Sequence, residues 1–90
     1  SMLPAGVEPP RRGSARLAGR VLRADGAPME RSVVVLHGSG ASDTTDASGR
    51  FALDSLPAGT FTLEARAIGY TPQRQPVDLL GDRVASADVT

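Results

Sequence analysis

The chain has 90 residues, a formal net charge of zero, no cysteine and only 3% aromatic residues. Balanced charge argues against nucleic acid and anionic membrane surfaces as partners, because a basic stripe supplies most of that affinity. The lack of cysteine excludes a disulfide framework and a thiolate metal site, and no apolar run approaches the ~20 residues that span a bilayer.

The composition of the first 13 residues indicates a linker that precedes a single domain. Ser1-Met2 is typical of the pair left when an affinity tag is removed, and residues 3–13 carry three Pro and two Gly without periodicity. Such Pro- and Gly-rich stretches mark linkers. We therefore assign residues 1–13 to a tag remnant and linker, and residues 14–90 to one domain.

Short apolar runs separated by turn signals predict seven strands in that domain. The expected strands cover residues 15–23, 32–37, 44–46, 50–54, 60–68, 73–79 and 83–89, with residues 38–43 as a loop. The alternation is cleanest at 60–68, and Pro72 and Pro76 indicate that the following strand lies at a sheet edge or begins irregularly. No stretch has the period of an amphipathic helix, so the pattern indicates an all-β sandwich or barrel.

Gly, Pro and Asp mark the chain reversals. Asp46 can accept a backbone N–H bond from two residues on, and Gly49 can take a positive φ. Tyr70 is expected to pack its ring as structure at one end of the sandwich. The residues assigned to structural turns are Asp25, Gly26, Asp46, Gly49, Pro57, Gly59, Gly69 and Tyr70.

The order of these features resembles the carboxypeptidase regulatory-like domain family, which has a transthyretin-like (prealbumin-like) sandwich. The stretches that carry the resemblance are 17–21 (LAGRV), 25–28 (DGAP), 45–51 (TDASGRF), 56–63 (LPAGTFTL) and the Gly-Tyr pair at 69–70. The resemblance implies a seven-stranded Greek-key β-sandwich of two antiparallel or mixed sheets. It also implies that Val34 and Leu36 face the core.

For function, the resemblance implies a non-catalytic accessory module of a larger bacterial protein, such as a peptidase or a TonB-dependent receptor. Its partner would be a neighbouring domain of the same parent protein or another protein, in an extracellular or cell-envelope setting (periplasm or outer membrane). A carbohydrate- or peptide-binding module is the alternative. The chain lacks Trp, however, and Tyr70 is its only Tyr, so few side chains could stack on a sugar ring.

Catalytic and metal chemistry find little support in the residues. His37 is the only histidine, and the nearby Gly38-Ser39-Gly40 lacks the Gly-x-Ser-x-Gly turn of a nucleophilic serine. Asp43 and Asp46 resemble part of a calcium loop without its closing bidentate Glu. We therefore expect no enzyme activity, no cofactor and no metal site.

The strand at 32–37 carries the candidate interaction surface. With Val34 and Leu36 inward, Val33, Val35 and His37 would lie on the outer face, and Leu22 could lie beside them. Exposed apolar strips often mark contact surfaces. Two alternatives remain open: the linker, through Leu3 and Val7, covers the strip, or the strand has the other register.

Charged residues on the expected strands receive no function. We predict that they form cross-strand pairs on solvated faces, where each pair contributes only ~0–1 kcal/mol. The residues concerned are Arg16, Arg20, Glu64 and Arg66.

Overall fold

A computed structural model describes residues 12–90, which form seven strands and no helix. The strands are β1 (Ala15–Val21), β2 (Val33–His37), β3 (Ala41–Thr44), β4 (Arg50–Leu56), β5 (Gly59–Arg66), β6 (Gln73–Leu79) and β7 (Val84–Val89). The described part of the chain therefore has no helix that could cross a membrane.

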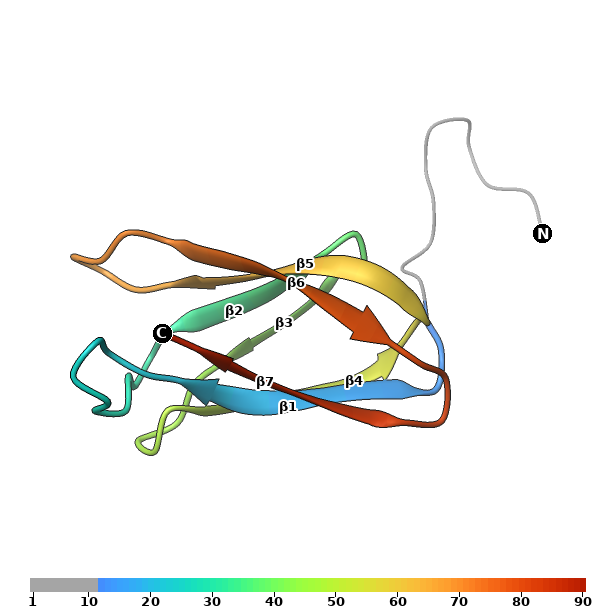
Figure 1. The fold of residues 1–90 in the computed structure, drawn as a ribbon, viewed down its shortest axis with the longest axis horizontal. Coiled ribbons are helices and arrows are strands. Elements are labelled where there is room, and N and C mark those ends of the chain that lie inside the picture. The colour runs from blue at the N-terminus through green and yellow to red at the C-terminus, as the bar shows by residue number, and fades with distance from the viewer. Residues whose placement is uncertain (1–11) are drawn as a thin grey trace.

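The seven strands form two sheets that pack face to face, as Figure 1 shows. One sheet has the order β4-β1-β7 and the other the order β3-β2-β5-β6. All neighbours are antiparallel except β1 and β7, which run parallel, so the first sheet is mixed. The predicted all-β, seven-stranded sandwich is confirmed, and β6 lies at a sheet edge, which is one of the two alternatives that its prolines indicated.

The core lies between the sheets and is mainly aliphatic. Alternate residues of each strand point inward, which follows from the period of two in a β-strand. Leu17, Leu36 and Leu63 are fully buried, and Phe51 is the only aromatic residue among the buried ones. The buried hydrophobic residues are Ala15, Leu17, Val21, Val34, Leu36, Phe51, Leu53, Leu56, Leu63, Ala65, Val77, Leu79, Ala87 and Val89.

The third predicted strand is wrong in its position. Residues 44–46 were expected to form it and residues 38–43 a loop, yet β3 covers Ala41–Thr44. The cause is Asp43, whose side chain points inward, where its Oδ2 accepts the N–H of Ala52 at 2.9 Å and joins β3 to β4 of the opposite sheet. A carboxylate at an inward position hides the apolar alternation that sequence reasoning relies on.

The other strands differ from expectation only at their ends. The strand at 50–54 extends to Leu56, and the strand predicted for 60–68 ends at Arg66. The Asx-type turn expected after Thr45 is present, because Asp46 Oδ1 accepts the N–H groups of Ser48 at 2.8 Å and Arg50 at 3.0 Å.

Candidate interaction surfaces

One end of the sandwich holds an apolar cavity of about 360 Å³. At this end the loop between β1 and β2 and the loop between β5 and β6 extend beyond the sheets, with the C-terminal end of β7 between them (Figure 1). The cavity opens to solvent between these loops. Its volume falls in the range of ~300–1,000 Å³ that is usual for binding pockets.

Small side chains on the four-stranded sheet leave this space open. Ala65, Ala67 and Ser32 line the cavity from that sheet and the segments next to it, whereas the middle of the core is filled by leucines. Val21 and Val89 line it from the opposite sheet. The result is an apolar pocket in which interior packing is incomplete. Filling it with an apolar group is favourable, because apolar area is removed from water and dispersion contacts form.

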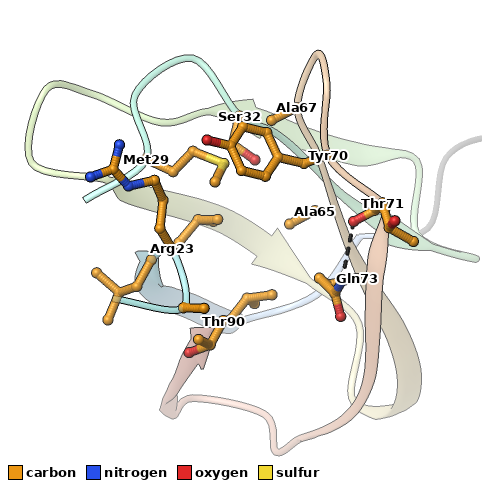
Figure 2. Close-up of a pocket in the computed structure, with 13 residues that line it drawn as sticks. Arg23, Met29, Ser32, Ala65, Ala67, Tyr70, Thr71, Gln73 and Thr90 are labelled. Carbon is orange, nitrogen blue, oxygen red and sulfur yellow. Dashed lines mark hydrogen bonds between the residues drawn. The ribbon is translucent and has the colours of Figure 1, made fainter. Parts of the chain in front are cut away.

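The rim of the cavity carries polar and aromatic groups. Figure 2 shows the Tyr70 ring and the Met29 side chain on one side of the opening and Thr90 on the opposite side. Arg23, which also lines the cavity, donates to Asp25 Oδ2 at 3.1 Å. Tyr70 lies at this end of the sandwich, where its ring lines the cavity and the residue is 54% exposed.

Ile68 follows the cavity-lining Ala67 in the chain, with its side chain in water. The residue belongs to the turn between β5 and β6 and is 102% exposed. It does not line the cavity, whereas Tyr70, two residues on, does. A single exposed apolar residue is common on a protein surface, so Ile68 by itself does not mark a contact surface.

The outer face of the four-stranded sheet is the second candidate surface. Val33, Val35 and His37 share this face, as the sequence predicted, with Val33 41% exposed and Val35 half-buried. Leu22 does not lie beside them. It follows β1 of the other sheet, forms a bridge with Pro28 and lines the end cavity, because the chain turns there toward the β1–β2 loop.

The proposed cover of Val33 and Val35 by Leu3 and Val7 lies outside the described residues. The register of β2 is settled, since Val34 and Leu36 are fully buried and their neighbours in the strand face outward.

Glu64 is the unexpected residue of this outer face. Its side chain is 0% exposed, although it was predicted to lie on a solvated face. Glu64 pairs with Arg74 on β6 and lies opposite Val35 on β2, and its carboxylate is covered by three donors. Arg66 Nε donates to Oε2, Arg74 Nε donates to Oε1 at 2.6 Å, and His37 Nε2 lies 3.3 Å from Oε1.

These donors hold the pKa of Glu64 at about 2, well below its ordinary value. The hydrogen bond from Arg66 lowers the pKa most, followed by that from Arg74, and together they outweigh the desolvation that would raise it. The cover over Glu64 is one layer of Arg and His side chains at the molecular surface. The carboxylate is thus ionised in the folded protein at any ordinary pH.

Acid is therefore expected to destabilise the domain through Glu64. Because its pKa is lowered by folding, the stabilisation is fully present above pH 4.5 and is lost as the pH falls toward about 2. In thermal melts from pH 7 to 2, Glu64→Gln should melt below the wild-type protein at neutral pH, and the difference should shrink in that acidic window.

Glu30→Gln is the matched control, because Glu30 is exposed in the β1–β2 connection. It should follow the wild-type curve across the whole pH range. A constant difference between Glu64→Gln and wild type from pH 7 to 2 would show that the Glu64 carboxylate is not held in its charged form by folding.

The residues considered for catalysis and metal binding are occupied by structural bonds. Ser39 is buried, and its hydroxyl donates to Leu36 O at 2.7 Å and accepts the N–H of Ala41 at 3.0 Å. Asp43 and Asp46 both accept backbone N–H groups. Among residues 12–90, no three His, Asp or Glu side chains are grouped as metal ligands.

The sequence indicated Val33, Val35 and His37 on the outer face, but it did not indicate the ion-pair cluster there or the end cavity. Arg74 was not selected, and Glu64 was given no role, because their contact depends on the pairing register of β5 and β6. The cavity was missed for a similar reason, since it is formed by Met29 and Ala67 from two separate loops. A run of small residues at the end of an otherwise aliphatic strand, as at Ala65 and Ala67, is the one signal that was available.

The fold and these surfaces define a β-sandwich domain of the transthyretin-like kind. Residues 16–90 match the carboxypeptidase regulatory-like domain family. The match covers most of the chain, which therefore belongs to this family, as its sequence resemblance predicted. A search of curated proteins finds no match.

Solved structures with the same fold include two from a type II cohesin–X-dockerin complex of Acetivibrio cellulolyticus. A chain of the complex with an N-terminal interface mutant aligns with a TM-score of 0.66 and 23% identity, over 82% of this chain and 52% of that chain. A chain of the complex with a C-terminal interface mutant aligns with a TM-score of 0.64 and 19% identity, over 86% and 53%. This chain thus spans about half of each matched chain, and the likeness establishes the fold.

Proposed function

We propose that this domain is a non-catalytic interaction module of a larger secreted or cell-envelope protein. In this proposal, the module docks a neighbouring domain or another protein by receiving apolar side chains in its end cavity. The observation that supports this proposal most is the apolar cavity of about 360 Å³ with the 54% exposed Tyr70 at its rim. The solved structures with the same fold come from protein–protein complexes, which supports a protein partner.

The chemistry of the cavity favours an aliphatic or aromatic side chain as its occupant. Leu22, Met29 and Ala67 provide apolar walls, and dispersion contacts with such walls accumulate over the whole surface of an inserted group. Interface cores are commonly built by an apolar anchor in a pocket, surrounded by a polar rim. Arg23 and Tyr70 supply that rim.

A carbohydrate-binding module is the second candidate, and the exposed Tyr70 ring is the observation that favours it. A sugar ring can stack on such a ring, but it also needs several hydrogen-bond partners. The Gln73 side-chain amide is already used in part within the protein, because its Nε2 donates a hydrogen bond to Thr71 O at 3.1 Å. The protein-docking function is therefore the better supported of the two.

Amide chemical shifts of the 90-residue protein test the proposal with side-chain probes. N-acetyl-leucinamide and N-acetyl-phenylalaninamide should shift the signals of Leu22, Ala67 and Tyr70, while N-acetyl-glycinamide should not. Ala67→Leu should fill part of the cavity, raise stability by about 1 kcal/mol as cavity filling commonly does, and abolish these shifts. Ala58→Leu, the same change at an exposed site between β4 and β5, should leave them intact.

Two results would overturn the docking function. The first is that the glycine amide shifts the same signals as strongly as the leucine amide, since the cavity would then have no preference for apolar groups. The second is that maltose shifts the Tyr70 signals while the apolar amides do not, which would favour the carbohydrate-binding module.

A further inference from the structure

The outer face of the four-stranded sheet carries a cationic cluster that the end cavity does not explain. The cluster comprises His37 on β2, Glu64 and Arg66 on β5, and Arg74 on β6, brought together by strand pairing. These side chains come from three neighbouring strands and converge on the Glu64 carboxylate.

Glu64 orients the two guanidinium groups toward solvent. It engages Arg66 and Arg74 through their Nε atoms, so the terminal nitrogens at the end of each side chain remain outside these two bonds. Both side chains stay accessible, with Arg66 55% and Arg74 67% exposed. A charged group that is already oriented loses less conformational freedom when it binds a partner.

The charge of the cluster indicates what it can bind. Two guanidinium groups face one carboxylate, which leaves a surplus of one positive charge even with His37 neutral. The other acid on this face, Asp78, lies four residues beyond Arg74 on β6 and accepts the Thr60 hydroxyl at 2.5 Å. The planar guanidinium matches a carboxylate in shape, with two parallel hydrogen bonds.

The apolar strip next to the cluster favours a protein segment over a free anion. Val33 pairs with Arg66 across the strands and is 41% exposed, and Val35 pairs with Glu64. A ligand that satisfies this face thus needs a carboxylate and an aliphatic group a few ångströms apart. Arginine beside apolar residues is a common composition of protein interfaces.

We propose that the outer face of the four-stranded sheet is a second docking surface, which binds an acidic protein segment through Arg66 and Arg74, with Val33 and Val35 as its apolar contact. Glu64 is a positioning residue in this surface, since it contacts the arginines and not the ligand. The surface lies on a different face from the end cavity, so the two proposals stand or fall separately.

A synthetic peptide, Ac-Glu-Val-Glu-NH2, provides the test. In an NMR titration it should shift the amide signals of Val33 and Val35 and the Nε–Hε signals of Arg66 and Arg74. The affinity should fall about tenfold between low salt and about 0.5 M NaCl, because salt screens exposed charges. Ac-Gln-Val-Gln-NH2, which has the same shape without charge, should produce no shifts on this face.

Variants separate binding from folding. Arg74→Gln should abolish peptide binding, whereas Arg50→Gln, the same charge change on an exposed residue of β4 in the other sheet, should leave it unchanged. If Arg74→Gln unfolds the domain, Arg74→Lys keeps the charge without the planar fork and should weaken binding several-fold. Val33→Thr keeps the strand shape and should weaken binding as well.

Three outcomes would overturn the proposal. One is equal affinity for the Glu and Gln peptides, because the surface would then not distinguish a charged peptide from an uncharged one. Another is that sodium sulfate shifts the same arginine signals with an affinity equal to that of the peptide, which would make the cluster a site for free anions. The last is that Arg74→Lys and Val33→Thr both bind the peptide as the wild-type protein does.

Discussion

Gly19→Ala is expected to destabilise the domain by about 3 kcal/mol, the upper end of the usual range for overpacking. In a domain of this size, that change lowers the melting temperature by roughly 12–24 °C. Gly19 lies in the middle of β1, where it pairs with Phe51 of β4 on one side and Ala87 of β7 on the other. A Cβ atom at this position would overlap the carbonyl oxygen of Ala87 and lie 3.1 Å from the Phe51 ring.

The clash at Gly19 involves backbone, which explains the size of the effect. The Ala87 carbonyl group belongs to β7, and moving it means separating β7 from β1 over their parallel pairing. Interiors transmit such displacements because they are close-packed. Strain in φ plays no part, since Gly19 is not among the residues with positive φ.

Gly26→Ala is the control for the Gly19 prediction. Gly26 has a φ of 87°, and a Cβ atom there would meet no atom within 4 Å. Its replacement should cost only the ~1–2 kcal/mol of a left-handed conformation in a residue with a Cβ atom. If thermal melts show equal losses for the two variants, β7 does not approach β1 at Gly19 as closely as described.

Thr45→Val is expected to destabilise the domain by about 2–3 kcal/mol, because it leaves two polar backbone groups without a partner. Thr45 is nearly fully buried just after β3. Its hydroxyl donates to Met29 O at 2.6 Å and accepts the N–H of Ser32 at 2.8 Å. These two bonds tie the β1–β2 connection to the end of β3, next to the cavity.

Valine keeps the shape of threonine, so the Thr45 variant removes the hydrogen bonds with little change in packing. Thr44→Val is the matched control, since Thr44 is the exposed neighbour on the outer face and its replacement should change stability by less than ~0.5 kcal/mol. Urea denaturation measures both free energies of unfolding. Equal values for the two variants would mean that the Thr45 hydroxyl is not a structural link.

The two candidate surfaces have different physical characters. The end cavity depends on apolar burial, which salt does not screen, whereas the outer face depends on the charges of Arg66 and Arg74, which salt does screen. Repeating both titrations at high salt therefore distinguishes the two surfaces within one sample. A module with two faces of different chemistry can hold two neighbours at once.

Local patterns in the sequence were enough for the fold class and most strands. The period of two between Phe61 and Arg66 predicted β5, and Asp46 with Gly49 predicted the turn before β4. The family match confirms the resemblance that these turns and strands carried. Such signals are local, because alternation and turn chemistry depend on residues within a few positions of each other.

Position along the chain could not determine which side chains meet. His37 is 27 residues from Glu64 in sequence, and Arg74 is 10 residues from it, yet both contact the same carboxylate. That contact requires β2, β5 and β6 to be neighbours in one register, which backbone pairing decides over the whole sheet. For the same reason, only the tertiary structure revealed the cavity, since its size depends on how far the β1–β2 loop and the β5–β6 loop stand apart.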